Sequence, residues 1–167
     1  MNDATSGRSR EVRLADRTSS GHFMPPPWWR KHSESGGEPK APVRIFLAED
    51  DDAMRFLVFE VLSAWGYEVT RIPDGRILRA YMKSAEAGRR PMPDLVISDV
   101  RMPGGSGLEV LEETRAVDWA TPVILITAFP DSATLAEARR LGAVAVLDKP
   151  FDLTDLLELV AIHAPPI

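Results

Sequence analysis

Short apolar runs alternate with amphipathic segments from residue 43 onward. Five runs of four to six residues consist mainly of apolar and β-branched residues, as buried parallel strands do. The predicted strands are residues 43–48, 67–72, 95–98, 123–126 and 144–147. Between them, apolar residues recur every three or four positions, which is typical of helices that bury one face. This alternation predicts an α/β fold, a doubly wound five-stranded parallel sheet with helices on both faces.

Capping and turn residues mark the ends of the predicted helices. We expect Asp52 to cap the first helix and Gly66 to end it. An Asp side chain accepts a hydrogen bond from the first helical turn, and Gly adopts the left-handed conformation that often ends a helix. For the same reason we expect Asp131 or Ser132 to begin the helix before the fifth strand, and Asp152 to begin the last one.

Residues 1–42 do not follow this pattern. They are rich in Ser, Gly, Pro and Arg, and their apolar residues show no sustained period, so we expect a disordered tail preceding a folded domain at 43–167. Within the tail, three prolines precede two tryptophans in the segment Pro25–Lys31. This segment is either a docking motif for a partner or for the domain itself, or part of a tail without a selected role.

Charge and composition exclude several classes of protein. The net charge is −5, with 13 basic and 20 acidic residues after position 42, which does not favour nucleic-acid binding. The chain has no cysteine, which excludes disulfides, thiolate metal sites and a Cys nucleophile. Its three histidines are too few and too scattered for a His-based metal site or a Ser/His/Asp triad. It shows no apolar run long enough to span a membrane and no signal-peptide core, so we expect a soluble cytoplasmic protein.

Side chains able to do chemistry follow four of the five predicted strands. They are Glu49 and Asp50 after the first, Asp99 after the third, Thr127 after the fourth and Lys149 after the fifth. Right-handed crossovers bring the carboxyl ends of parallel strands to one edge of the sheet, where ligands of such folds bind. Converging carboxylates repel each other unless a cation lies between them, and carboxylates with waters suit Mg²⁺. The ammonium and hydroxyl groups suit phosphoryl oxygens, which makes Asp99 a candidate nucleophile.

Two other classes of similar fold fit this pattern less well. A nucleotide or flavin binder would carry Gly, Ser or Thr after the first strand, whereas this chain carries four consecutive acids at 49–52. A phosphoaspartate hydrolase of the haloacid dehalogenase type would carry a second Asp two residues beyond the nucleophile. Here that position is Arg101, which cannot act as the general acid or base.

Residues 43–163 resemble the receiver domain of bacterial two-component response regulators. The resemblance is carried by four stretches in the expected order, which are Ile45–Asp51, Leu95–Gly104, Val123–Ala128 and Asp148–Phe151. It implies a flavodoxin-like (βα)5 fold. It also implies that Asp99 is the phosphoacceptor and that Mg²⁺ binds Asp50, Asp99 and the backbone carbonyl of Arg101. Glu49 stands where the family usually has Asp, and would act through a metal-bound water.

The resemblance assigns further roles and shows one departure. Thr127 and Lys149 would each bind a phosphoryl oxygen after modification, and the Lys149–Pro150 peptide bond is expected to be cis, as it is in similar domains. The family usually carries Tyr or Phe three residues before the lysine, as a rotameric switch. This chain has Val146 there, so the usual coupling is absent or rerouted, and Phe129 is the candidate to take over part of that role.

The resemblance leads to a functional expectation. We expect a stand-alone receiver that takes its phosphoryl group from a histidine kinase or phosphotransfer protein and then contacts a downstream protein target. It would be a phosphoacceptor rather than a turnover enzyme, a monomer or weak dimer, and without nucleic-acid or membrane partners. The alternatives are a receiver-like interaction module that works without phosphorylation and, with less support, a phosphoaspartate hydrolase.

Overall fold

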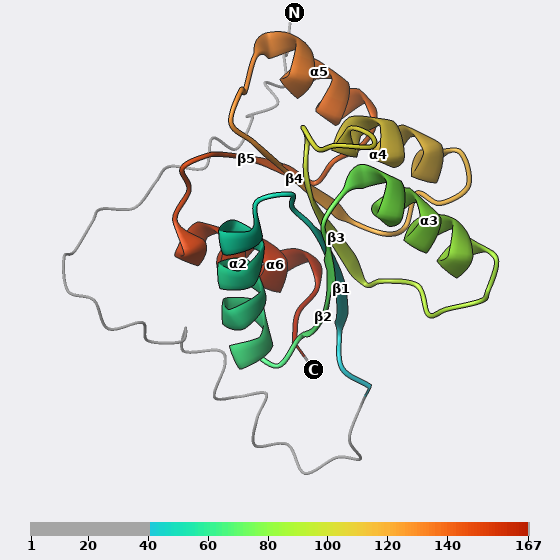
Figure 1. Cartoon of the computed structure of the whole chain (residues 1–167), viewed down its shortest axis with the longest axis vertical. Coiled ribbons are helices and arrows are strands. Elements are labelled where there is room, and N and C mark those ends of the chain that lie inside the picture. Colours follow the sequence, from blue (N-terminus) through green and yellow to red (C-terminus); the bar gives the residue numbers. More distant parts are fainter. Residues whose placement is uncertain (1–40, 167) are drawn as a thin grey trace, which may run out of the picture. The chain divides into compact units, whose positions relative to one another are not determined.

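Residues 41–166 are described by the computed structural model, and they form one parallel sheet with helices on both faces (Figure 1). The strands lie in the order β2-β1-β3-β4-β5, and all neighbouring pairs are parallel. Their bounds are Arg44–Ala48 (β1), Glu68–Ile72 (β2), Leu95–Asp99 (β3), Val123–Thr127 (β4) and Ala145–Asp148 (β5). The predicted fold class is confirmed, and each strand end lies within one residue of its predicted position.

The helices form two layers. Their bounds are Asp52–Ala64 (α2), Gly75–Glu86 (α3), Gly107–Arg115 (α4), Ser132–Arg140 (α5) and Leu153–His163 (α6). In Figure 1, α2 and α6 cover one face of the sheet, while α3, α4 and α5 cover the other. The strand order turns back between β1 and β3, and the crevice beyond their carboxyl ends is where open sheets of this kind bind ligands. None of the described helices has the length and apolarity that a membrane crossing requires.

The central strands are buried on both faces. Phe46, Val96 and Leu125 belong to an apolar cluster that also contains residues of α3, α4 and α5. Ile97 and Ile124 alternate with them, are fully buried, and therefore face α2 and α6. Burial on both faces explains why these strands are continuous apolar runs rather than alternating ones.

Each described helix begins at a side-chain cap. The capping residues are Asp51, Asp74, Ser106, Asp131 and Asp152. The prediction that Asp52 caps α2 is wrong by one residue, because the carboxylate of Asp51 accepts the hydrogen bond from the Met54 N–H at 2.7 Å. Asp52 is instead the first residue of the helix, where it is exposed and pairs with Arg55. Of the predicted tail at 1–42, only Ala41 and Pro42 are among the described residues. The segment Pro25–Lys31 lies outside them.

Candidate functional site

Four strand ends bring the candidate residues to one edge of the sheet. Glu49 follows β1, Asp99 and Thr127 are the last residues of β3 and β4, and Lys149 follows β5. Because β1, β3, β4 and β5 are successive neighbours that run in one direction, their carboxyl ends lie together. The backbone adds a direct link between the last two, since the N–H of Lys149 donates to the carbonyl of Thr127 at 2.7 Å.

Glu49, Asp50 and Asp99 form an acidic cluster. A carboxylate oxygen of each lies within 4.8 Å of those of the other two. Glu49 and Asp99 are only 1% and 6% exposed, whereas Asp50 is exposed. The cluster is therefore enclosed by protein on the side of the sheet and open to solvent at Asp50.

The ammonium group of Lys149 bonds to both buried carboxylates. Its Nζ lies 2.7 Å from Oε2 of Glu49 and 2.6 Å from Oδ2 of Asp99. Burial acts to lower the pKa of Lys149, but the hydrogen bonds to Asp99 and Glu49 and the negative charges of these two residues together outweigh it, so that pKa is raised. Lys149 therefore stays charged at neutral pH and offsets part of the repulsion between the two acids.

The environment of Glu49 disfavours its charged form. Burial raises the pKa of its carboxyl group, and the nearby charge of Asp99 raises it further. Hydrogen bonds from Lys149 and from the backbone of Asp51 lower that pKa without cancelling the increase. A divalent cation bound there would favour the ionised form of this carboxylate. The three residues of the cluster offer carboxylate oxygens as metal ligands, and the side open to solvent leaves room for coordinating waters. Both features fit Mg²⁺.

Backbone donors and an arginine hold the acids in place. The N–H of Asp51 donates to Oε1 of Glu49 at 3.0 Å, and the N–H of Arg101 donates to Oδ1 of Asp99 at 2.9 Å. Nη1 of Arg55 donates to the backbone carbonyl of Glu49 at 2.7 Å. The sequence did not single out Arg55. Its only sequence signal is the spacing of three residues from Asp52, with which it pairs in the first turn of α2.

A contact between two loops lies near Asp99. The Oγ1 of Thr127 accepts a hydrogen bond from the N–H of Phe129 at 3.0 Å. The Phe129 ring is 58% exposed, and the guanidinium of Arg101 lies over it, 4.7 Å from the ring centroid. Arg101 and Phe129 thus join the loops after β3 and β4 through a cation–π contact. Both residues were candidates from the sequence, but their contact was not predicted.

The remaining predictions concern β5 and the loop after it. Val146 lies opposite Leu125 of β4 and packs, partly buried, against the apolar cluster under α3, α4 and α5. An aliphatic side chain therefore occupies the place where the family usually has an aromatic ring. The Lys149–Pro150 bond is cis, which confirms that prediction.

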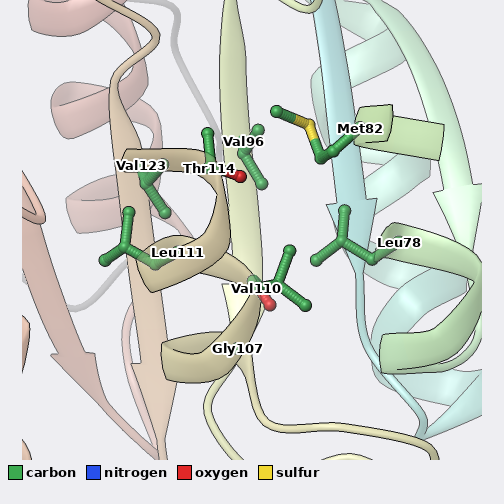
Figure 2. Close-up of a pocket in the computed structure, with 9 residues that line it drawn as sticks. Leu78, Met82, Val96, Gly107, Val110, Leu111, Thr114 and Val123 are labelled. Atoms are coloured by element: carbon green, nitrogen blue, oxygen red, sulfur yellow. The ribbon is translucent and has the colours of Figure 1, made fainter. Parts of the chain in front are cut away.

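A small pocket lies between α3, α4 and the sheet (Figure 2). It is lined by Leu78, Met82, Val96, Ser98, Gly107, Val110, Leu111, Thr114 and Val123. The lining is almost entirely apolar, and the hydroxyl of Ser98 already donates to the backbone carbonyl of Asp99 at 3.0 Å. None of the described residues that line this pocket is charged, so the acidic cluster is the better candidate for chemistry.

Comparison with known proteins identifies relatives of the whole folded region. Residues 45–161 match the family described as the response regulator receiver domain. The chain is 28% identical over 122 residues to Sporulation initiation phosphotransferase F of Bacillus subtilis, covering 73% of this chain and 94% of that protein. It is 34% identical over 122 residues to Transcriptional regulatory protein PdtaR of Mycobacterium tuberculosis, covering 72% of this chain and 56% of that protein.

Solved structures give the same result. The chemotaxis protein CheY4 of Vibrio cholerae is similar with a TM-score of 0.64 and 29% identity, over 74% of this chain and 99% of that one. The Mn²⁺-bound form of response regulator Rcp1 gives a TM-score of 0.61 and 29% identity, over 71% and 89% of the two chains. The curated relatives differ in length, however. The chain spans about half of PdtaR and only 23% of Regulatory protein AtoC of Escherichia coli, to which it is 34% identical.

Proposed function

The chain belongs to the response regulator receiver domain family of two-component systems, and on that basis we propose that Asp99 accepts a phosphoryl group from a partner protein. The observation that carries this proposal is the Lys149 ammonium, which bonds to Asp99 and Glu49 within the acidic cluster. A cation in contact with the nucleophile also lies beside the oxygens of an incoming phosphoryl group. An ordinary loop acid has no such partners.

Magnesium is the proposed cofactor of this reaction. We expect Asp50, Asp99 and the backbone carbonyl of Arg101 to bind Mg²⁺, with Glu49 acting through a water. When bound, Mg²⁺ would neutralise charge that develops on the transferring phosphoryl oxygens. The acidic cluster supports this site, as does the Mn²⁺ bound by the similar response regulator Rcp1.

The proposed step is a transfer between two proteins. An oxygen of Asp99 attacks the phosphorus of a phosphohistidine, the new O–P bond forms as the P–N bond breaks, and the imidazole keeps the electron pair. Among the described residues the only histidine is His163, at the end of α6, so we expect the donor to be a histidine kinase or phosphotransfer protein. The chain would serve as phosphoacceptor and not as a turnover enzyme.

Phosphorylation would then change the loop between β4 and α5. The added charge of about −1.5 to −2 attracts the ammonium of Lys149 and the hydroxyl of Thr127. Because Val146 replaces the usual aromatic residue, Phe129 and its contact with Arg101 are the proposed route from Thr127 to α5. The output would be a changed contact with a downstream protein. We expect the receiver domain to be monomeric or weakly dimeric and to have no nucleic-acid or membrane partner.

Acetyl phosphate with Mg²⁺, followed by intact mass measurement, tests the proposal. The wild-type chain should gain one phosphoryl group and Asp99→Asn none. Asp148→Asn is a matched control, because Asp148 is an exposed acid at the end of β5, which is separated from β3 by β4, and this variant should still be phosphorylated.

Two results would overturn the proposal. A wild-type chain that forms no adduct with acetyl phosphate and does not bind beryllofluoride would favour an interaction module that works without phosphorylation. Steady release of phosphate from a small phosphorylated molecule, unchanged in Asp99→Asn, would favour a hydrolase.

A further inference from the structure

The loop between β3 and α4, residues 100–106, carries the backbone carbonyl of Arg101, one of the proposed Mg²⁺ ligands. Two adjacent glycines, Gly104 and Gly105, lie in its middle with φ angles of 79° and 145°. Glycine restricts the backbone less than any other residue, so this sequence alone does not fix the position of the loop. Contacts from outside the loop must therefore hold it.

One of these contacts comes from the start of α3. The N–H of Gly75 donates to the carbonyl of Pro103 at 3.0 Å. A Cβ atom at Gly75 would lie 2.0 Å from the carbonyl oxygen of Gly105 and 2.7 Å from its carbonyl carbon. Those distances are far below van der Waals contact, so the loop can approach α3 this closely only if residue 75 has no side chain. The Asp74 cap fixes this first turn, because its carboxylate accepts the Ile77 N–H at 2.8 Å.

A similar contact joins the two ends of the loop. The N–H of Gly107, the first residue of α4, donates to the carbonyl of Val100 at 2.9 Å. A Cβ atom at Gly107 would lie 2.4 Å from the carbonyl oxygen of Asp99. Figure 2 shows Gly107 at the start of α4, with Leu78 of α3 and Val110 of α4 on neighbouring helices around the pocket. Glycines on two different helices therefore contact the loop closely, Gly75 of α3 at Pro103 and Gly105, and Gly107 of α4 at the residues where the loop begins.

An ion pair keeps α3 and α4 together beside the loop. Nε of Arg79 in α3 donates to Oε1 of Glu113 in α4 at 2.9 Å. The guanidinium of Arg79 also lies next to Gly105, where its Nη2 would be 3.2 Å from an added Cβ atom. The contact through Gly75 thus belongs to a packed interface between α3, the loop and α4.

We propose that Gly75 is a positioning residue for the phosphorylation site. By letting the start of α3 touch the loop, it holds the carbonyl of Arg101 where Mg²⁺ is to bind, although Gly75 itself touches neither the ion nor the phosphoryl group. This inference rests on the proposed function, since it concerns the Mg²⁺ site of that function.

Gly75→Ala tests the proposal, with Gly88→Ala as the matched control. Gly88 lies just beyond the other end of α3, with a φ of 70° and no atom of residues 41–166 within 4 Å of an added Cβ atom, so within the described region alanine there brings backbone strain alone. Mg²⁺ affinity is measured by calorimetry on the full chain, next to a thermal unfolding curve. Gly75→Ala should weaken Mg²⁺ binding about tenfold, because losing the support of the loop that carries a metal ligand resembles the loss of an outer-shell partner. Gly88→Ala should lower the melting temperature without weakening Mg²⁺ binding.

Results for the variants test the role of Gly75, and results for the wild-type chain test the proposed function. Wild-type affinity in Gly75→Ala, or equal weakening in both variants, would overturn the role of Gly75. Absence of Mg²⁺ binding and of phosphorylation in the wild-type chain would instead overturn the proposed function.

A second measurement uses the wild-type chain and remains valid if Gly75→Ala does not fold. Coupling between two sites is reciprocal, so Mg²⁺ binding should strengthen the hydrogen bond from Gly75 to Pro103. Hydrogen exchange of the Gly75 amide should therefore slow when Mg²⁺ is added, while exchange of the Gly88 amide, which donates to Ala85 at 2.9 Å, stays the same. An unchanged Gly75 amide contradicts the proposal.

Discussion

Glu49 is a buried acid whose pKa is raised by burial above its ordinary value of 4.5. The folded chain therefore binds this proton more tightly than the unfolded chain does. Stability should fall as pH rises from 4.5 through the raised pKa, and remain lower above it. Glu49→Gln should remove this part of the pH dependence.

Urea unfolding of the metal-free protein at a series of pH values checks this prediction. As pH rises from 4.5 through the raised pKa of Glu49, the unfolding free energy of the wild-type chain should fall relative to that of Glu49→Gln. A constant difference would show that burial of Glu49 does not carry the effect. Added Mg²⁺ should reduce the difference, because a cation favours the ionised carboxylate.

The sequence predicted some site residues better than others, for a physical reason. Asp50, Asp99 and Lys149 follow predicted strands, and the geometry of parallel sheets alone brings such positions to one edge. Arg55 and Gly75 act through backbone carbonyls of other segments, Glu49 and Pro103 respectively. No periodicity or spacing encodes contacts of that kind, so they emerge only from the folded chain.

Among the elements, α4 is fixed at its C-terminal end by one buried side chain. Arg115, only 6% exposed, donates to the carbonyls of Leu141, Asp118, Thr121 and Gly142 at 2.9–3.3 Å. Arg115→Met should lower the free energy of unfolding by about 3 kcal/mol, because it leaves buried carbonyl groups without donors. Mg²⁺ affinity should not change, because Arg115 and Gly107 lie at opposite ends of α4.

Chemical denaturation and Mg²⁺ titration of the same samples test this prediction. The exposed Arg139 of α5 supplies the control, since Arg139→Met should alter stability by no more than about 0.5 kcal/mol. Equal effects of the two variants on stability would argue against a special role of Arg115.

The loop leading into α5 gives a prediction about switching. Phe129→Ala removes the ring that Arg101 contacts but keeps the backbone N–H that bonds to Thr127. Phosphorylation by acetyl phosphate should persist, whereas the beryllofluoride-induced change in hydrogen exchange across α5 should become smaller. Val117→Ala is a control at another exposed apolar position. An unchanged response of α5 in Phe129→Ala would exclude Phe129 as the route.

Local sequence signals predicted the elements well except at one cap. Apolar, mostly β-branched runs such as 123–126 predicted the strands, because a strand that is buried on both faces consists almost entirely of apolar residues. At α2 two acids adjoin, and both Asp51 and Asp52 are good capping residues. Only the path of the backbone after β1 decides that Asp51 is the cap.

At the scale of the whole molecule, Mg²⁺ binding should stabilise the fold by mass action. When the free Mg²⁺ concentration is one hundred times its dissociation constant, the free energy of unfolding should rise by about 2.7 kcal/mol. Urea unfolding with and without Mg²⁺ measures the increase. Asp50→Asn should lose most of it and Asp148→Asn should keep it. A similar increase in both variants would mean that Mg²⁺ binds outside the acidic cluster.

The hydroxyl of Thr127 accepts a hydrogen bond from the backbone of Phe129, yet an alcohol that accepts retains its own hydrogen. A phosphoryl oxygen can receive that hydrogen while the bond to Phe129 persists. In the proposed reaction, movement of the alcohol toward phosphorus would displace the adjoining backbone at the same time. Signalling through Thr127 would then require no exchange of partners, so loss of the phosphoryl group would return the loop to its starting position along the same path.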